Sequence, residues 1–385
     1  MRVNIVSPEF PPDVGGVETY AYEFARELQR RGHAVKVFTI RHEAGEARIP
    51  GIEVQPVLTL RRNVDWRVLR QHEADVWHAM TAGYAWLALE GVPTVVSVHG
   101  NDFLWPRVHM AQLSVQGLPV LWRLSRFDPA WLKPFWAWRT RRLLARSMPK
   151  ARRIVANSRF TEQAFLRLHP GCAGRTTVAY VGVADKFFDV PRAGAHRGPA
   201  RLLTVCRLSE PRKNVDVVLR ALAELAEDHE FEYTVIGDGH RRPQLEQLAA
   251  SLGLADRVHF RGRVGEQELM RAYGEADLFV LTASILPGSH EGFGIVYLEA
   301  AASGLPSLAA RQAGAAEAVE DGVSGMFVER ADAQSVAAAL RRFFEGSWRF
   351  DAAACREFAA RFRWPRVVDA VLPYYQGSTP TSRAA

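Results

Sequence analysis

Short apolar, β-branched runs alternate along this chain with longer stretches in which apolar residues recur at helical spacing. The short runs are apolar at nearly every position, which is typical of strands covered on both faces and therefore of a parallel sheet. This alternation predicts an α/β fold. In residues 1–190 we expect strands at Val3–Ser7, Ala34–Ile40, Ile52–Val57, Asp75–Ala79, Thr94–His99, Arg153–Ala156 and Val178–Val181.

The segment Asp189–Pro199 interrupts the pattern and, being rich in proline, glycine and arginine, is typical of a linker. The alternation then starts again, so we expect two tandem α/β domains with a cleft between them. Strands are expected at Leu202–Cys206, Tyr233–Ile236, Val258–Phe260, Leu278–Leu281 and Pro306–Ala309, and helices at Asn214–Glu227, Arg242–Leu252, Glu266–Tyr273 and Ile295–Ser303. The tail, residues 377–385, is expected to be disordered.

The composition limits the cellular compartment and the classes of binding partner that we expect. The 385 residues suffice for two domains with cores of their own. The net charge of +7 fits an anionic partner such as nucleic acid, phospholipid headgroups or a phosphate-bearing substrate. Three cysteines without disulfide or zinc spacing favour the cytoplasm. The sequence shows no signal peptide at Met1-Arg2 and no apolar run near the roughly 20 residues of a membrane span.

Two motifs in the first half follow expected strands, where parallel sheets bind ligands. Gly15-Gly16 opens a helix, so backbone N–H groups there are able to approach an anion closely. The alternative is a tight turn that uses glycine for a positive φ. His99 ends the run Thr94–Val98 and is placed to bind a sugar hydroxyl or to act as acid or base. The alternative is a structural, hydrogen-bonded histidine.

A third motif brings two cations to one turn between a strand and a helix. Arg207 and Lys213 lie six residues apart, and together a guanidinium fork and an ammonium group are suited to hold a diphosphate. Solvated surface charge is the alternative, and it is our interpretation of the neighbouring Arg212.

The most informative motif carries two carboxylates eight residues apart, Glu291 and Glu299. A glycine-rich loop leads from Glu291 into a helix that is expected to begin near Ile295. The free N–H groups at that helix start favour an anion. A diphosphate there would place a sugar toward Glu291 and a ribose toward Glu299, because carboxylates accept hydrogen bonds from paired hydroxyls. The alternative for Glu299 is an exposed helical residue.

In this order, the motifs resemble those of a retaining GT-B glycosyltransferase of family 4 over almost the whole chain. The resemblance depends on Gly15-Gly16-x-Glu18, Arg31-Gly32-His33, Arg207…Lys213, Glu291-x7-Glu299 and Gly304-x-Pro306. It implies two facing Rossmann-like domains with parallel sheets and an interdomain cleft. The first, residues 1–190, would bind the acceptor and be joined by a C-terminal helix at 361–376, and the second, 191–360, would bind the nucleotide-sugar donor.

The resemblance also assigns roles. Glu291, His99, Arg207 and Lys213 would be catalytic: the two cations neutralise the diphosphate, while Glu291 and His99 contact the transferred sugar. Glu299 would bind the ribose, Arg263 and Val264 would lie near the base, and Gly15 and Gly16 would line the phosphate end. Further donor contacts would come from the amides of Phe293, Gly294 and Ile295. The substrate would be a UDP- or GDP-linked hexose, transferred with retention to a hydroxyl of a glycan or lipid-linked acceptor in envelope polysaccharide or glycolipid synthesis.

Two features modify this interpretation. The family often has two glycines followed by Pro-Glu where this chain has Ala313-Gly314-Ala315-Ala316-Glu317, which leaves the donor sugar open. No Asp-x-Asp pair follows an expected strand, so we predict a metal-independent reaction with no cofactor, in which cations and the helix start stabilise the leaving group.

Residues 121–153 are basic and rich in tryptophan, which is typical of a segment lying on an anionic membrane surface. This would place the protein on the inner face of the plasma membrane. The alternatives are an aromatic face packed on the first domain and, as a minor option, single-stranded nucleic acid. Expected membrane or acceptor contacts are Trp131, Trp136, Trp138, Arg139, Arg141 and Arg142.

Two other functions remain open at this point. One is a sugar-nucleotide epimerase or hydrolase on the same fold, which would act without an acceptor. The other is a non-catalytic module that binds sugar nucleotide. The presence of Glu291, Arg207, Lys213 and His99 argues against it, because a module without catalytic activity could lose these residues without harm.

Overall fold

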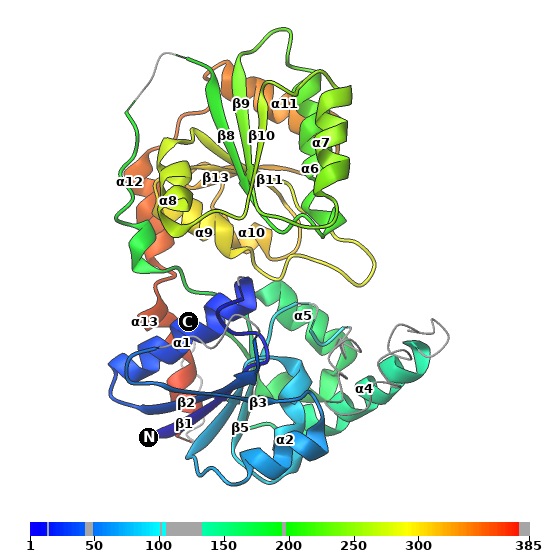
Figure 1. The fold of residues 1–385 in the computed structure, drawn as a ribbon, viewed down its shortest axis with the longest axis vertical. Coiled ribbons are helices and arrows are strands. Elements are labelled where there is room, and N and C mark those ends of the chain that lie inside the picture. Colours follow the sequence, from blue (N-terminus) through cyan, green and yellow to red (C-terminus); the bar gives the residue numbers. More distant parts are fainter. Residues whose placement is uncertain (14, 43–48, 101, 105–132, 195–197, 377–385) are drawn as a thin grey trace. The chain divides into compact units, whose positions relative to one another are not determined.

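The chain forms two compact units in a computed structural model. The structure describes residues 1–385 except 14, 43–48, 101, 105–132, 195–197 and 377–385 (Figure 1). Unit 1 comprises Met1–Tyr180 and Trp364–Ala385, and unit 2 comprises Val181–Arg363. The expected disordered tail and Trp131 lie outside the described residues.

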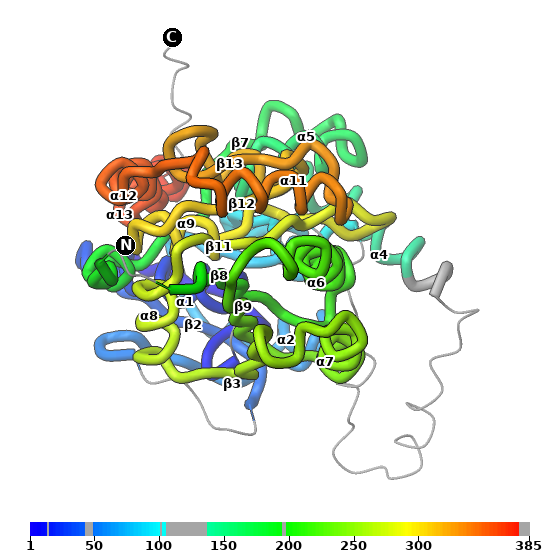
Figure 2. The backbone as a smooth tube through the Cα atoms, turned by 90° about the horizontal axis from the view of Figure 1, so that it is seen from above, coloured from blue at the N-terminus to red at the C-terminus, as the bar shows by residue number. Residues whose placement is uncertain are grey.

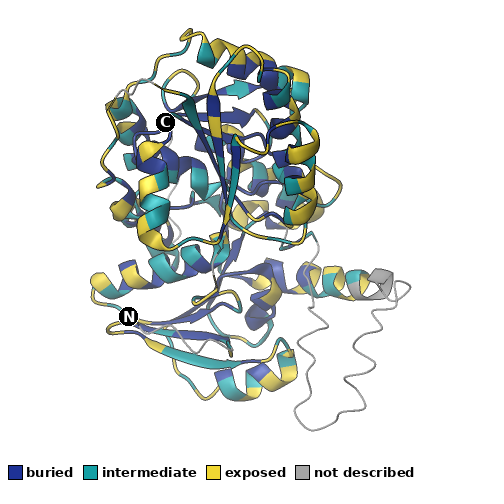
Figure 3. Ribbon diagram, turned by 45° about the horizontal axis from the view of Figure 1, so that its top comes forward, coloured by how far each residue is buried: buried dark blue, intermediate teal, exposed yellow. Residues whose placement is uncertain are grey.

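Unit 1 is built on a parallel sheet of seven strands in the order β3-β2-β1-β4-β5-β6-β7. Its inner strands are buried along most of their length, as the apolar runs predict, whereas the two edge strands are mainly half-buried (Figure 3). The strands are β1 (Arg2–Val6), β2 (Ala34–Ile40), β3 (Glu53–Leu58), β4 (Val76–Ala79), β5 (Thr94–Val98), β6 (Arg153–Ala156) and β7 (Thr176–Val178). The α-helices are α1 (Gly16–Arg30), α2 (Arg62–Leu69), α4 (Lys133–Ser147), α5 (Arg159–Leu168) and α13 (Trp364–Val371).

Unit 2 is built on a parallel sheet of six strands in the order β10-β9-β8-β11-β12-β13. The strands are β8 (Ala200–Val205), β9 (Phe231–Ile236), β10 (Val258–Gly262), β11 (Leu278–Leu281), β12 (Ser307–Ala310) and β13 (Gly325–Val328). The α-helices are α6 (Val215–Ala223), α7 (Arg242–Ser251), α8 (Glu266–Glu275), α9 (Ile295–Ala302), α10 (Ala315–Ala318), α11 (Ala333–Phe344) and α12 (Ala352–Ala360). Helices α6 and α7 lie side by side, and α6 also packs on α11 (Figure 2).

Two parallel α/β sheets confirm the predicted fold class. The prediction was wrong at β7, because we expected the strand to start at Val178 and the observed strand ends there. The prediction also missed β13, α11 and α12. β13 is a four-residue edge strand that begins with glycine, so it lacks a long apolar run. Residues 190–193 of the expected linker pack within unit 2: Val190 is buried, and the Ala193 N–H donates to the Gly274 carbonyl.

The strand order of each sheet places a ligand-binding edge. In unit 1 the order reverses between β1 and β4, and in unit 2 it reverses between β8 and β11. Open parallel sheets bind ligands beyond the carboxyl ends of the strands that flank such a reversal. The segments that follow β8 and β11 are therefore the first place to look for a site in unit 2.

The end of the chain is anchored in unit 1 by a buried hydrogen-bonded chain. The Tyr375 hydroxyl lies 2.5 Å from Nδ1 of His78, whose Nε2 lies 2.9 Å from the Ser97 hydroxyl. Burial lowers the pKa of His78 to about 3, so this imidazole is neutral and has one donor and one acceptor nitrogen. Nearby, α13 packs on α1, where Arg31 donates to the Pro365 carbonyl.

Within the described residues, the structure shows no helix with the length and hydropathy required to cross a bilayer.

Tyr375→Phe is expected to destabilise unit 1 by about 1–3 kcal/mol, because it leaves a buried nitrogen of His78 without a partner. Hydrogen exchange in β4 and α13, compared with the core of unit 2, measures the effect. Tyr374→Phe is the comparison, because it removes hydrogen bonds to Arg153 and Thr177 from a half-buried hydroxyl. If Tyr375→Phe were as stable as the wild type, the His78 contact would carry no stability.

Candidate functional site

The candidate site begins in the two segments that follow β8 and β11. Arg207 comes two residues after β8, and Lys213 ends the 3₁₀ helix Pro211–Lys213 before α6. Glu291 lies in the loop between β11 and α9. These segments flank the reversal of strand order, so the topology brings the two motifs to one place.

A buried ion cluster joins the two segments. Lys213 Nζ donates to Oε2 of Glu291 at 2.5 Å, and Arg212 donates to the same oxygen at 2.7 Å. A second nitrogen of Arg212 pairs with Glu210. Arg212 is only 6% exposed, so our interpretation of it as a solvated surface charge was wrong. Its Nε is buried without a hydrogen-bond partner among the described residues.

The cluster keeps Glu291 ionised. Burial alone would raise the pKa of Glu291, but the charges of Lys213 and Arg212 and their hydrogen bonds outweigh it and lower this pKa to about 2. A charged acceptor is thereby held at the strand ends at every physiological pH.

Local backbone conformation explains why the turn before α6 sits against β11. Asn214 is left-handed, with φ 54°, a conformation that asparagine tolerates better than most residues. Its side-chain amide donates to the Thr282 carbonyl at 2.7 Å, and the Ser284 N–H donates to the Arg212 carbonyl at 2.8 Å. The 3₁₀ helix is therefore fastened to the segment that follows β11.

The start of α9 provides an anion-binding helix end. Gly294 precedes the helix at φ 91°, and a Cβ atom there would meet the Tyr297 ring at 2.6 Å, so glycine is required on both counts. Phe293 is buried and its ring lies 5.7 Å from that of Phe362. The Phe293 side chain therefore belongs to the core of unit 2, and the predicted contact of its amide with a ligand stays a prediction.

Unlike Glu291, Glu299 accepts no hydrogen bond from a cation in the part of the chain that the structure describes. Its Oε2 accepts a hydrogen bond of 2.9 Å from the buried Tyr273 hydroxyl. Burial raises the pKa of Glu299 to about 7, although the Tyr273 hydrogen bond lowers it. The Glu299 side chain is half-buried, so the alternative that it is an ordinary exposed residue of a helix is wrong.

Three further predicted donor contacts lie at the same edge of the sheet. Arg207 is exposed after β8, whereas Arg263 and Val264 follow β10, two strands away. A ligand that reached from β11 to β10 would cross the carboxyl end of the sheet.

In unit 1, neither glycine of the Gly15-Gly16 motif is left-handed, since Gly15 is extended with φ 176° and Gly16 begins α1. The tight-turn alternative is therefore wrong. Gly15 caps α1 in an extended conformation, and a Cβ atom on Gly16 would contact no heavy atom within 4 Å. Packing among the described residues does not require glycine at Gly16, and the phosphate contact expected there stays a prediction.

His99 ends β5 in a tight, apolar setting. Its ring lies 4.6 Å from the ring of Tyr20, and its Nε2 is buried without a hydrogen-bond partner among the described residues. Burial lowers the pKa of His99 to about 4, so the ring is neutral at pH 7. The backbone N–H of His99 donates to Asp102 at 2.9 Å, which fixes the loop.

Helix α4 carries the predicted surface contacts. Trp138, Arg139, Arg141 and Arg142 are all exposed, and Arg142 lies over the Trp138 ring at 5.4 Å. The side chain of Trp136 lies outside the described part of the structure.

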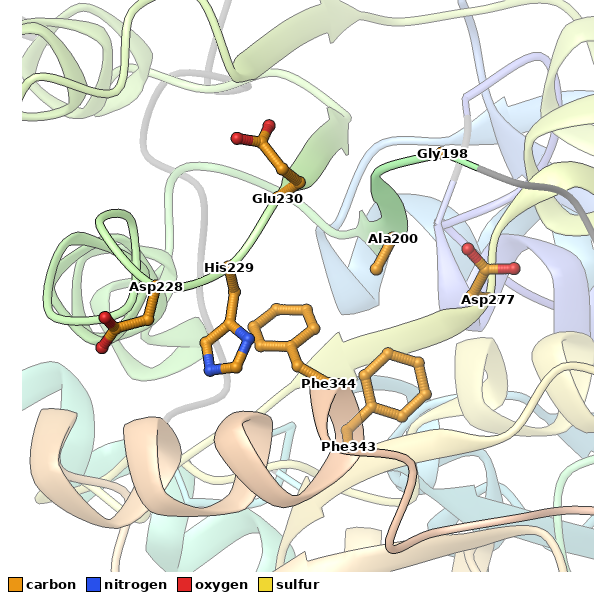
Figure 4. A pocket seen from close by; sticks show the side chains of 8 residues that line it. All are labelled: Gly198, Ala200, Asp228, His229, Glu230, Asp277, Phe343 and Phe344. Carbon is orange, nitrogen blue, oxygen red and sulfur yellow. The ribbon is translucent and has the colours of Figure 1, made fainter.

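A cavity of about 440 Å³ lies elsewhere in unit 2 (Figure 4). Its lining comes from the amino ends of β8, β9 and β11 and from Phe343 and Phe344 of α11. This is the edge opposite the motif residues, so the cavity is not the candidate site.

The sequence analysis missed two residues of the site, Arg212 and Tyr273. Arg212 had a signal in its position beside Lys213, whereas Tyr273 belongs to a helix with no motif of its own. Among the described residues, no cluster of three His, Cys, Asp or Glu side chains is arranged to hold a metal ion. Metal independence stays a prediction.

Comparison with known proteins places these motifs in a family. Residues 14–187 match a family model described as Glycosyltransferase Family 4, and residues 199–345 match one described as Glycosyl transferases group 1. The D-inositol 3-phosphate glycosyltransferase of Geodermatophilus obscurus is 31% identical, with 97% of this chain and 87% of that protein covered.

Solved structures share the fold. HepE of Anabaena, in complex with UDP-glucose, has a TM-score of 0.74 at 20% identity, covering 98% of this chain and 100% of that one. Sucrose-phosphate synthase from Thermosynechococcus elongatus has a TM-score of 0.74 at 17% identity, covering 97% and 98%. At these identities the likeness concerns the fold alone.

Glu299→Gln is expected to stabilise the protein at pH 8 by about 2–3 kcal/mol and to be nearly neutral at pH 5. The folded-state pKa of Glu299, about 7, lies above the ordinary value of 4.5. Burying the charged form therefore lowers stability increasingly as pH rises from about 4.5 through 7. Urea unfolding at both pH values measures the difference from wild type.

The matched control is Glu291→Gln, whose pKa shift has the opposite sign. Its stabilising charge is lost only as pH falls from about 4.5 through 2, so this variant should be equally destabilised at pH 5 and pH 8. A pH-independent effect of Glu299→Gln would show that Glu299 is not the titrating group.

Proposed function

Because the chain belongs to glycosyltransferase family 4 and has the GT-B fold, we propose that it transfers a hexose from a nucleoside-diphosphate donor to a hydroxyl. Transfer proceeds with retention of anomeric configuration, as the resemblance implies. The acceptor is a glycan or lipid-linked molecule of the cell envelope.

One observation carries this proposal: a carboxylate and two cations meet at the reversal point of the unit 2 sheet, next to the start of α9. Breaking a sugar–phosphate bond leaves a nucleoside diphosphate with growing negative charge. Lys213, Arg207 and the amides at Gly294 and Ile295 stabilise that charge, and such stabilisation is often the largest catalytic contribution. Glu291 accepts hydrogen bonds from the sugar.

The remaining donor contacts of unit 2 that we propose lie at the same carboxyl edge of its sheet. Glu299 binds the ribose hydroxyls, and Arg263 and Val264 lie near the base. His99, Gly15 and Gly16 of unit 1 contribute the sugar and phosphate contacts that the resemblance assigns to them. A UDP-linked hexose is the first donor to test, because HepE was solved with UDP-glucose. Cations take the place of a metal in this scheme.

Lys213→Met is expected to reduce turnover at least tenfold, since one such donor contributes about 3 kcal/mol to the barrier. Release of UDP or GDP from a panel of hexose donors in the presence of acceptors measures turnover, and it should continue in EDTA. Lys36→Met is the control, because Lys36 pairs with Glu53 on β3 in unit 1. Wild-type turnover in Lys213→Met would refute the assignment.

We further propose that α4 docks on an anionic membrane surface. Four arginines of this helix, Arg139, Arg141, Arg142 and Arg146, are exposed beside Trp138, which is 53% exposed. A basic helix with an exposed tryptophan suits the lipid interface. Docking there would bring a lipid-linked acceptor to the enzyme.

Replacing Arg139, Arg141 and Arg142 by Gln and Trp138 by Ala is expected to weaken binding to anionic vesicles about a hundredfold, at about 1 kcal/mol per charge. Vesicle sedimentation measures binding. The control replaces Arg61, Arg67 and Arg70, which are exposed beside or within α2, by Gln. Equal binding by both variants would exclude α4 as the anchor.

A further inference from the structure

Two cations that are adjacent in the chain donate to the same carboxylate oxygen, Oε2 of Glu291. The proposed function requires Lys213 to neutralise the donor's diphosphate. An ammonium group that turns to phosphate no longer holds Glu291, so another group must keep the carboxylate charged and in place.

Arg212 has the geometry for that second task. Its guanidinium spans two carboxylates, those of Glu291 and Glu210, whereas among the described residues the Lys213 ammonium group is bonded to Glu291 alone. Its backbone carbonyl accepts the Ser284 N–H at 2.8 Å. Arg212 is therefore fixed by both ends, and moving it would break its ion pairs with two carboxylates.

We propose that Arg212 is a positioning residue that holds Glu291 ionised and oriented while Lys213 is released to the diphosphate. This inference rests on the proposed function and divides the work of the two cations. Donor-free, the cluster has two positive and two negative charges; when the diphosphate arrives, Lys213 changes partner and Arg212 does not.

The other titratable groups around Glu291 do not substitute for Arg212. Tyr297 of α9 and Cys206 after β8 interact electrostatically with it. Burial raises the pKa of Cys206 to about 12 and raises that of Tyr297 well above its usual range, so both are neutral at pH 7. The charges that lower the pKa of Glu291 are those of Lys213 and Arg212, and Glu210 pairs with Arg212.

Loss of Arg212 should thus make catalysis sensitive to acid. Removing one adjacent cation raises a carboxylate pKa by about 1–3 units, and burial of Glu291 acts in the same direction. In the donor complex, where Lys213 is engaged with phosphate, Glu291 would then take up a proton in mildly acidic solution and lose its charge.

The experiment measures kcat from pH 5 to pH 8 for Arg212→Met and Arg212→Lys, each divided by wild-type kcat at the same pH. For Arg212→Met we expect the ratio to fall about fivefold between pH 8 and pH 5, as a raised carboxylate pKa requires. Arg212→Lys restores the charge and should abolish that fall. Arg311→Met, which removes an exposed ion-paired arginine of the same unit, should give a constant ratio of about one.

A pH-independent ratio for Arg212→Met overturns the inference, whether activity is normal or uniformly reduced, because a purely structural residue would give that result. Thermal unfolding verifies that each variant is folded. If Arg212→Met does not fold, Lys213→Met decides: Arg212 alone should keep its residual kcat ratio constant to pH 5, and a fall in acid overturns the inference. Absence of sugar transfer by the wild-type enzyme would instead refute the proposed function.

Discussion

The ion cluster of Glu291, Arg212 and Lys213 is the interaction on which the candidate site depends. It ties the segment after β8 to the segment after β11, which are distant in sequence. A buried carboxylate is costly unless cations and hydrogen bonds compensate for its lost hydration. Removing Arg212 would therefore affect both the charge of Glu291 and the position of its loop, and α9 begins at the end of that loop.

The two glutamates of the motif show how burial produces opposite electrostatics. Both are desolvated, but Glu291 has two cations bonded to it, whereas Glu299 has the neutral Tyr273 hydroxyl. The pKa of the first is lowered to about 2 and that of the second is raised to about 7. Glu299 is thus poised to gain from a ligand that donates hydroxyl groups, since such bonds favour its ionised form.

Periodicity predicted most of the fold, and motif order singled out the segments that form the candidate site, because long apolar runs and glycine-rich strand ends are local features. What they could not predict depends on tertiary contact. Arginine is usually a surface residue, and Arg212 is buried because the segment that follows β11 packs against it. Tyr273 meets Glu299 from another helix, and β13 is held by its neighbour β12 rather than by a strong pattern.

The departure at residues 313–317 follows the same logic. Gly314 cannot change, because a Cβ atom there would lie 2.1 Å from the Gly292 carbonyl oxygen, and its N–H donates to the Glu291 carbonyl. Ala313 has φ 51°, a left-handed conformation that glycine adopts at less cost. Ala313 thus takes a conformation that suits glycine, and its methyl group lies next to the residue whose N–H holds the Glu291 carbonyl, so this turn and the loop that carries Glu291 constrain each other.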